Sequence, residues 1–334
     1  MARNNTFDLL VFALLIAALP FFLGSNYPVM VLNIAALNIL VVIGLNLLMG
    51  YAGQISLGHA AFFGLGAYLS AIFTVTLGLP ILGAIVLATA ATALVAYLLG
   101  IPTLKLEGHY LVMATLGFNV IIYILMIQLD SVTGGPSGFA GIPSLAIGGF
   151  VFDSDRKMYY LLWTVAICVL ILSRNLTHSR VGRAMAALAH NEIAARCAGI
   201  DTETYKVKIF VLSAVLASLA GSLYAHYLTF ISPGSFSFSY SIQVVTMVLV
   251  GGIHSLWGSM FGAILLTILP EVLQVVKDYN VLIYGAILMG VMVFFPSGLF
   301  PALAGYIQKR GAPSGPSKII GTSGVPEKRG LTQR

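Results

Sequence analysis

Seven residues that can bind a ligand or titrate lie within or beside long apolar runs of this chain. They are Asn38, Asn46, Gln54, Ser56, His59, Gln243 and Glu271. A polar group inside an apolar run costs free energy unless it is hydrogen-bonded, so each either bonds a neighbouring helix or faces a polar path. The set predicts a path for a ligand with hydrogen-bonding groups, with helix packing as the alternative. For His59 a structural role is favoured.

Glu271 is the one carboxylate of this set, and an intramembrane carboxylate is a functional candidate by default. It follows Pro270 directly, and Lys277 is six residues further along the chain. If Glu271 lies at the outer interface, Lys277 can pair with it. The sequence leaves open whether Glu271 is a functional carboxylate within the membrane or an ion-pair partner of Lys277 at the interface.

Two glycine-rich breaks interrupt the apolar runs. The first, at 50–68, reads GYAGQISLGHAAFFGLGAY, and the second, at 250–263, reads VGGIHSLWGSMFGA. High glycine density weakens a helix and allows backbones to approach closely. Polar residues at such a break suit a substrate path. The shared Ser-Leu and glycine pattern suggests two related halves, with chance similarity as the alternative.

The segment Gly182–Gly199 concentrates arginines in a chain with only 8% charged residues. Its residues from Arg183 to Cys197 are mostly good helix formers, and Gly199 is a plausible stop. We expect one short helix that docks on another protein, with Ala186, Ala187, Ile193 and Ala194 on its apolar side. A helix lying on the membrane is the alternative. The predicted docking residues are Gly182, Arg183, Ala186, His190, Asn191, Glu192, Ala194, Ala195, Arg196 and Gly199.

Motifs of soluble enzymes are missing from the chain. No lysine follows a glycine, so a G-x-x-x-x-G-K-[ST] phosphate loop is excluded. No H-E-x-x-H occurs, the six histidines lack metal-ligand spacing, and two cysteines give no disulfide framework. We therefore expect no enzyme activity, no metal and no cofactor bound by this chain.

Composition predicts an all-α polytopic membrane protein. Hydrophobic residues make up 59% of the chain, and several runs approach the roughly 20 residues that cross a bilayer. About ten transmembrane or re-entrant segments are expected, with 241–252 short enough to be re-entrant. They are 7–24, 29–49, 60–77, 81–100, 110–129, 158–173, 207–230, 241–252, 258–276 and 281–295. The first lacks a clean cleavage site after it, which favours a retained helix over a signal peptide.

The basic residues predict the orientation. With a cytoplasmic N-terminus, fourteen of the 17 lysines and arginines fall on the cytoplasmic side. Both termini are then cytoplasmic, and the Gly/Pro-rich loop 130–157 is external. The net charge of +6 thus reflects topology beside lipid rather than nucleic-acid binding. Residues 1–304 form the membrane domain, and 305–334 form a flexible basic tail.

Four motifs together resemble the permease subunits of branched-chain amino acid ABC importers, of the LivM type. They are GLNLLMGYAGQISLGHAAFFGLGAY at 44–68, TGGPSG at 133–138, SRVGRAMAALAHNEIAARCAGI at 179–200 and GGIHSLWGSMFGA at 251–263. In the importer pattern E-A-A-x-x-x-G, Ile193 occupies the acidic position here, with Glu192 one residue early. The segment 182–199 is similar to the part that couples such permeases to their ATPases.

The resemblance implies a subunit of the bacterial inner membrane that works in a complex. Its partners would be a paralogous permease, two ATP-binding subunits that hydrolyse ATP, and an external substrate-binding protein. The expected cargo is Leu, Ile or Val, whose zwitterion needs neutral polar groups and an apolar wall. An importer of urea or short amides is the alternative cargo class. A self-sufficient secondary transporter is an alternative from another functional class, and a membrane-embedded enzyme is the least favoured alternative.

Overall fold

The computed structural model describes residues 4–22, 25–106, 108–273, 280–295 and 298–300. The tail predicted at 305–334 lies outside these residues. The helices are α1 (Asn4–Phe22), α2 (Asn26–Asn46), α3 (His59–Val75), α4 (Ile81–Thr103), α5 (His109–Gln128), α6 (Asp130–Thr133), α7 (Asp155–His178), α8 (Arg180–His190), α9 (Glu192–Cys197), α10 (Thr202–Leu228), α11 (Phe238–Gly251), α12 (Leu256–Leu273) and α13 (Asn280–Phe294).

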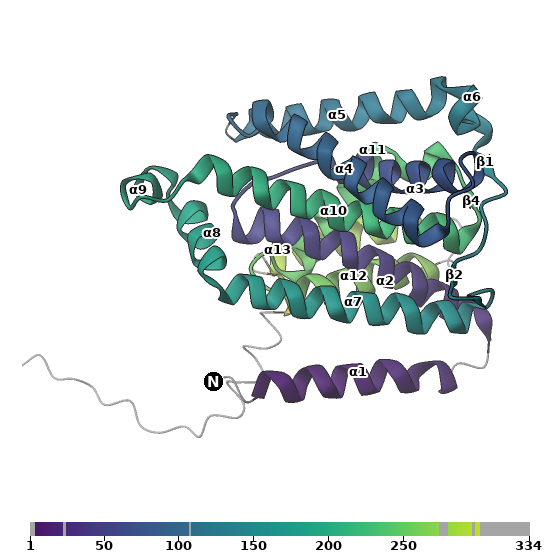
Figure 1. The fold of residues 1–334 in the computed structure, drawn as a ribbon. Coiled ribbons are helices and arrows are strands. Elements are labelled where there is room, and N and C mark those ends of the chain that lie inside the picture. Colours follow the sequence, from purple (N-terminus) through teal and green to yellow (C-terminus); the bar gives the residue numbers. More distant parts are fainter. Residues whose placement is uncertain (1–3, 23–24, 107, 274–279, 296–297, 301–334) are drawn as a thin grey trace, which may run out of the picture.

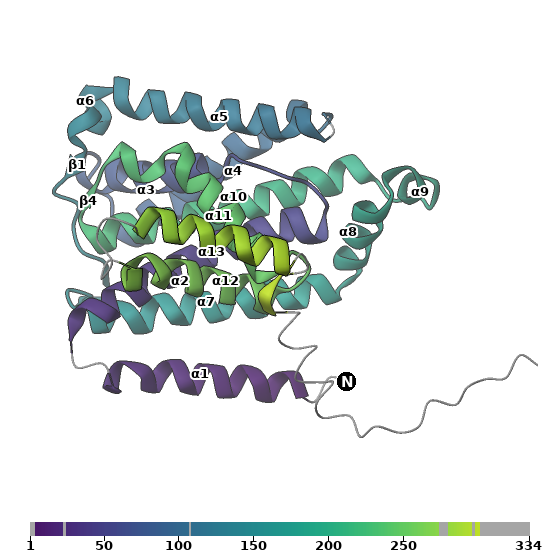
Figure 2. The same ribbon diagram turned by 180° about the vertical axis from the view of Figure 1, so that it is seen from behind.

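Each predicted apolar segment coincides with one of the longer helices. Within the described residues, six helices are long and apolar enough to cross a membrane, namely Asn26–Tyr51, α4, α5, α7, α10 and α12. Helices α1, α3 and α11 are also apolar, but their apolar stretches are only 10–17 residues long. Figures 1 and 2 show the long helices running side by side as one bundle, with α1 along one flank.

Helix α2 forms the centre of the bundle. Its residues are apolar on all sides, which is typical of a helix buried on all sides, and it packs against α7, α10 and α12. A π-helical turn, η1 (Leu47–Tyr51), continues α2 into the first glycine-rich break. The chain then runs without regular structure until α3 begins at His59. The first break therefore lies at the end of the most buried helix.

Helices α3 and α10 approach each other through small residues. A Cβ atom at Gly66 would lie 2.1 Å from the carbonyl oxygen of Ser218, and one at Gly221 would lie 1.8 Å from that of Phe63. The hydroxyl of Ser222 donates to the Gly66 carbonyl at 3.0 Å. Interfaces of this kind depend on backbone contact, which only glycine permits here.

The two ends of the bundle differ in character. At one end lie α8 and α9; at the other lie α6 and the short strands. Strand β1 (Phe139–Ala140) pairs antiparallel with β4 (Phe230–Ile231), and β2 (Ala146–Ile147) pairs with β3 (Phe150–Val151). The 3-10 turns η2 (Gly135–Ser137) and η3 (Pro233–Phe236) complete this end. The turns expected in 130–157 are confirmed, and β1 ties this loop to the end of α10.

The single helix predicted from Arg183 to Cys197 is wrong. The chain forms two helices, α8 and α9, because Asn191 takes an extended conformation with φ −160° and ψ 110°. Its side-chain oxygen accepts from the Ala194 amide at 3.0 Å. Asparagine competes with helical hydrogen bonding and favours this capping position.

The buried side of α8 and α9 also differs from the expected apolar face. Ala195 is buried on α9, whereas Ile193 is 76% exposed and Ala194 is also exposed. On α8 the buried residues are Gly182, Ala184, Met185 and Leu188, while Ala186 and His190 are exposed. The exposed Ile193 therefore gives α9 an apolar tip that the described part of the chain does not cover.

Candidate functional site

A cavity of about 420 Å³ lies between α2, α10, α11 and α12. Three of the predicted path residues, Asn38, Gln243 and Glu271, line it together. Its other lining residues are Met30, Ile34, Leu37, Phe63, Tyr224, Leu228, Ser235, Tyr240, Thr267 and Pro270. The cavity thus joins neutral polar groups and one carboxylate to an apolar wall, in helices more than 200 residues apart in sequence.

A hydrogen-bonded chain orients the amide of Asn38 in this cavity. The Tyr240 hydroxyl donates to Asn38 Oδ1 at 2.9 Å, and Asn38 Nδ2 donates to Thr267 Oγ1 at 2.9 Å. Thr267 donates in turn to the Ala263 carbonyl at 2.7 Å. The first bond joins α11 to α2, and the second joins α2 to α12. This series of hydrogen bonds therefore links three helices. Movement of one helix would break it.

Glu271 is also engaged across helices. The Tyr27 hydroxyl, at the start of α2, donates to the Glu271 carboxylate. Lys277, the partner expected if Glu271 lies at the outer interface, lies outside the described part of the chain. Tyr27 therefore contacts a carboxylate that lines the cavity together with its neighbour Pro270.

The other predicted path residues lie elsewhere. Asn46 donates to the Ser255 carbonyl at 3.0 Å, and His59 Nε2 lies 2.5 Å from Ser213 Oγ on α10. Ser56 Oγ accepts from the Gly58 amide at 3.3 Å. Gln54 lines a second, smaller cavity. Each of Asn46, Ser56 and His59 thus has a hydrogen-bond partner within the described bundle, and none of the three lines the 420 Å³ cavity.

Sequence reasoning missed Tyr240 and Thr267 in the cavity. Both stand in apolar segments among other tyrosines and threonines, and a threonine hydroxyl in a helix ordinarily bonds its own backbone. Thr89, Thr92 and Thr246 do so here. Only the position of Asn38 opposite them gives Tyr240 and Thr267 a further partner, and no local pattern encodes that position.

The two glycine-rich breaks contact each other directly. His254 Nδ1 donates to the Gly50 carbonyl at 2.8 Å, and the Tyr51 hydroxyl donates to the His254 carbonyl at 3.2 Å. A Cβ atom at Gly50 would lie 1.8 Å from the carbonyl oxygen of Ile253. The breaks therefore form one junction, which requires glycine at position 50 and joins the end of α2 to the start of α12.

The predicted docking segment is fixed to α10 by an ion-pair cluster. Glu192 accepts from Lys206 Nζ at 2.5 Å and from Arg196 Nη2 at 2.9 Å. Arg196 Nε also donates to Thr202 Oγ1 at 2.8 Å, and Glu203 lies 3.8 Å from Arg196. Lys206 is buried. Glu192 and Arg196, predicted to contact another protein, are therefore engaged within the chain and hold α9 on the first turns of α10.

Comparison with known proteins decides the family. Residues 27–296 match the family model described as branched-chain amino acid transport system, permease component. The chain belongs to this family. The matched range begins in the first turn of α2, so the cavity, both breaks and the docking segment of this permease all fall within it.

Named relatives of the permease agree with this assignment. It is 32% identical to the high-affinity branched-chain amino acid transport system permease protein LivM of Escherichia coli, over 92% of this chain and 78% of the relative. LivM of Salmonella typhimurium is also 32% identical, over 88% and 75%. LivH of Salmonella typhimurium is 24% identical, over 83% and 92%. No solved structure matches the chain.

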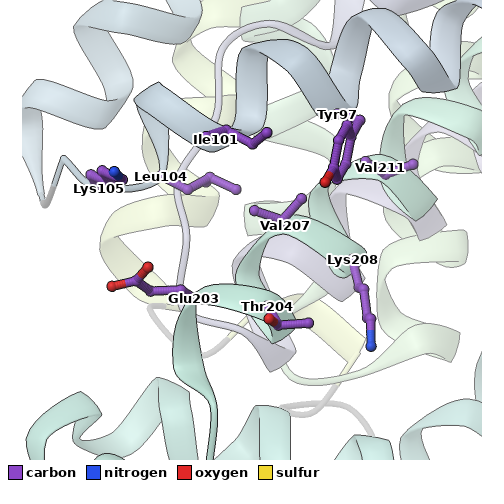
Figure 3. Close-up of a pocket in the computed structure, with 9 residues that line it drawn as sticks. All are labelled: Tyr97, Ile101, Leu104, Lys105, Glu203, Thr204, Val207, Lys208 and Val211. Carbon is purple, nitrogen blue, oxygen red and sulfur yellow. The ribbon is translucent and has the colours of Figure 1, made fainter.

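A separate groove on the permease lies between the end of α4 and the start of α10 (Figure 3). Its walls are mainly apolar, and its lining residues are Tyr97, Ile101, Leu104, Lys105, Glu203, Thr204, Val207, Lys208 and Val211. None of the predicted path residues lines it. The groove places Lys105 beside the start of α10, at the same end as α8 and α9.

The ion-pair cluster makes the stability of the permease depend on pH. Partial burial raises the pKa of the Glu192 carboxyl, but hydrogen bonds and charge attraction from Lys206 and Arg196 outweigh it, so the net pKa falls below the ordinary value. A carboxyl whose folded pKa is depressed contributes stability above its unfolded pKa of about 4.3 and loses it as pH falls through the folded value.

Glu192→Gln should therefore destabilise the permease at pH 7 by about 1–3 kcal/mol, because it leaves the buried Lys206 without its counter-charge. The difference in unfolding midpoint between wild type and variant should shrink as pH falls below about 4. Thermal unfolding of the purified chain across pH measures it. Glu203→Gln is the control, since the Glu203 side chain is 67% exposed. A midpoint difference that does not depend on pH would contradict the ion-pair role.

Proposed function

We propose that this chain is a membrane-spanning permease subunit of an ATP-driven, binding-protein-dependent importer for Leu, Ile and Val. Family membership supports this most directly, together with 32% identity to LivM proteins over most of the chain. Similarity to LivH as well supports pairing with a second, paralogous permease. The two permeases would form the translocation path between them, in the inner membrane of a bacterial-type cell.

The proposed topology has about ten transmembrane or re-entrant segments and cytoplasmic termini. Lys105 and the basic residues of 174–208 lie at the end of the bundle that carries α8 and α9, whereas Arg156 and Lys157 lie at the opposite end beside Asp153. Cytoplasmic ends carry the excess of Lys and Arg. The end with α8 and α9 is therefore cytoplasmic in this proposal, and the end with the short strands is external.

The chemistry of the 420 Å³ cavity suits a small neutral amino acid. Asn38, Gln243 and Tyr240 offer hydrogen-bond donors and acceptors without net charge, while Glu271 offers one carboxylate that an ammonium group can pair with. Leu37, Ile34 and other apolar residues give a wall for an aliphatic side chain. This lining supports the cavity as part of the path.

Energy for import would come from partner subunits, because the chain has no phosphate loop. Two ATP-binding subunits would dock at α8 and α9, and ATP binding would move these helices. The attachment of α9 to α10 through Glu192 and Lys206 would carry that motion into the bundle. An external binding protein would deliver cargo at the opposite end, against the loop 130–157.

The test is uptake by the reconstituted importer. We expect ATP-dependent uptake of labelled leucine that requires both permeases, the ATP-binding subunits and the binding protein. Asn38→Leu should reduce uptake about tenfold, which corresponds to about 1.4 kcal/mol, because it breaks the link between Tyr240 and Thr267. Thr164→Val is the control, since Thr164 is exposed on α7 and its hydroxyl donates to the Tyr160 carbonyl of its own helix.

Three outcomes would contradict parts of this proposal. Uptake of urea or short amides in place of leucine would change the cargo. Ion-driven uptake by the purified chain alone would replace the importer with a secondary transporter. Full uptake by Asn38→Leu, with normal assembly, would remove the cavity from the path.

A further inference from the structure

Most of the hydrogen-bond donors that line the 420 Å³ cavity are already used within the protein. The Tyr240 hydroxyl donates to Asn38 Oδ1, Asn38 Nδ2 donates to Thr267 Oγ1, and the Thr267 hydroxyl donates to the Ala263 carbonyl. Asn38 Nδ2 keeps a second N–H, but the residue is only 5% exposed. The oxygens of Tyr240 and Thr267 still have a lone pair each. These three side chains therefore offer a ligand acceptors rather than donors.

The Gln243 amide is different, because its donors are unused and within reach of the cavity. Gln243 is partly exposed, lines the cavity, and makes no hydrogen bond with another residue that the structure describes. It follows Tyr240 by three residues on α11, which places both side chains on one face of the helix. Ser235, also in the lining, accepts from the Tyr224 hydroxyl at 3.4 Å and keeps its own O–H for a ligand. Gln243 and Ser235 thus supply the free donors.

The two polar groups of an amino acid make opposite demands on this lining. The ammonium group only donates, and the oxygens of Tyr240, Thr267 and Glu271 can accept from it. The carboxylate only accepts, and taking it out of water is costly unless donors replace the water. Gln243, with two N–H groups on Nε2, is the main source of such donors in the cavity. A hydrogen bond to a carboxylate is also about twice as strong as one between neutral groups.

We propose that Gln243 binds the carboxylate of the cargo and thereby makes the permease select amino acids over the corresponding amines. This assignment rests on the proposed function, because it takes the cavity as part of the path for an amino acid. A site built to hydrogen-bond one group of its ligand discriminates strongly against an analogue that lacks the group. Gln243 is then a specificity-determining residue, whereas Asn38 acts by linking helices.

A cation in the cavity would compete with Gln243 for the carboxylate. Among the lining residues that the structure describes, Glu271 is the one charged side chain, and it is acidic. Lys277 and Asp278, six and seven residues beyond Glu271, lie outside the described residues. Lys277 is the cation closest to Glu271 in the sequence, so the experiment includes a variant at this position.

Thiol protection measures ligand binding in the assembled importer, held in lipid nanodiscs without ATP. Met30→Cys introduces a thiol in the cavity lining, and native Cys168 and Cys197, exposed outside the lining, are internal references. The thiols react with N-ethylmaleimide at increasing ligand concentration, and peptide mass spectrometry resolves them. We expect L-leucine to slow labelling at position 30 about threefold or more, with little change at the references. Isoamylamine, which lacks only the carboxylate, should require about tenfold or more higher concentration.

Two substitutions of Gln243 separate carboxylate binding from packing. Gln243→Leu removes both donors at similar size and should abolish protection by leucine. Gln243→Glu introduces a carboxylate that repels the leucine carboxylate but accepts from the amide N–H of leucinamide. Leucinamide should then protect better than leucine by about tenfold, the reverse of the wild-type order, and a purely structural role of Gln243 predicts no reversal. Thr246→Val, on the same helix but outside the lining, is the control and should keep the wild-type order.

Several results would overturn the assignment of Gln243. They are leucine protection that survives Gln243→Leu, equal protection by leucine and isoamylamine in the wild type, and absence of any protection by leucine. Loss of protection in Lys277→Gln but not in Gln243→Leu would assign the carboxylate to Lys277 instead. Leucine uptake by the wild-type importer is measured in parallel. Any of these results with intact uptake contradicts the role of Gln243 alone, whereas absence of uptake contradicts the proposed function.

Discussion

Gly221→Ala should leave the permease unable to fold stably. A Cβ atom at this position would lie 1.8 Å from the carbonyl oxygen of Phe63 and 3.0 Å from the amide nitrogen of Ala67. Both are backbone atoms of α3, so no side-chain rotation relieves the contact. Helices α3 and α10 must then separate along their length. Overpacking of a core costs about 1–3 kcal/mol or more, and here it also breaks the Ser222–Gly66 hydrogen bond.

Gly117→Ala is the matched control for this prediction. Gly117 is also inside a helix, α5, but nothing lies within 4 Å of a Cβ atom placed there. By helix propensity alone, alanine is more favourable than glycine by about 1 kcal/mol at both positions. We expect Gly117→Ala to raise or keep the unfolding midpoint. We expect Gly221→Ala to lower it by about 2–12 °C or to yield only aggregate, since 1–3 kcal/mol corresponds to roughly 2–4 °C per kcal/mol in a large domain. Equal midpoints for the two variants would contradict the close contact.

Most helices of this fold could be predicted from the sequence because their signal is local. An apolar run long enough to cross a membrane identifies itself, and the segment predicted at 81–100 is observed as Ile81–Thr103. The glycine density at Gly50 likewise marked the point where α2 ends in a π-helical turn. Such features depend on neighbours in the sequence, which a single chain shows directly.

Features that depend on distant partners could not be predicted. The sequence pointed to Asn38, Gln243 and Glu271 as polar residues, but not to the cavity that they share. Asn46 and His59 have the same chemistry as the cavity residues, yet they bond Ser255 and Ser213 instead. Only the packing of helices some 200 residues apart separates a residue that lines a path from one that holds helices together.

The docking segment, 182–199, also combines features that could be predicted from the sequence with features that could not. Its place and its polar character could be predicted from the sequence, whereas the ion pairs that Glu192 makes with Arg196 and Lys206 within the chain could not. Asn191 could have indicated the break between α8 and α9, because it is a strong helix-capping residue. Ile193, at the position where the importer pattern has an acidic residue, is the large apolar side chain that α9 exposes.

Ile193→Lys should therefore abolish coupled transport while the chain still folds. The Ile193 side chain is 76% exposed, so the substitution removes little packing within the permease. On the proposed function, the ATP-binding subunit covers this tip, and an ammonium group there loses apolar burial and gains a desolvation cost. Central apolar anchors of an interface are worth at least about 2 kcal/mol. With the desolvation cost added, we expect uptake to fall more than 100-fold.

Retention of the ATP-binding subunits during purification separates docking from other defects. Ile193→Lys should release these subunits from the complex. Leu77→Lys is the matched control, because Leu77 is 61% exposed in the turn between α3 and α4, at the end of the bundle opposite to α9. It makes a similar chemical change without touching the docking surface, so the subunits should be retained. Normal uptake and normal retention in Ile193→Lys would show that α9 does not dock on the ATPase through its tip, and the force of ATP binding would then have to enter the permease elsewhere.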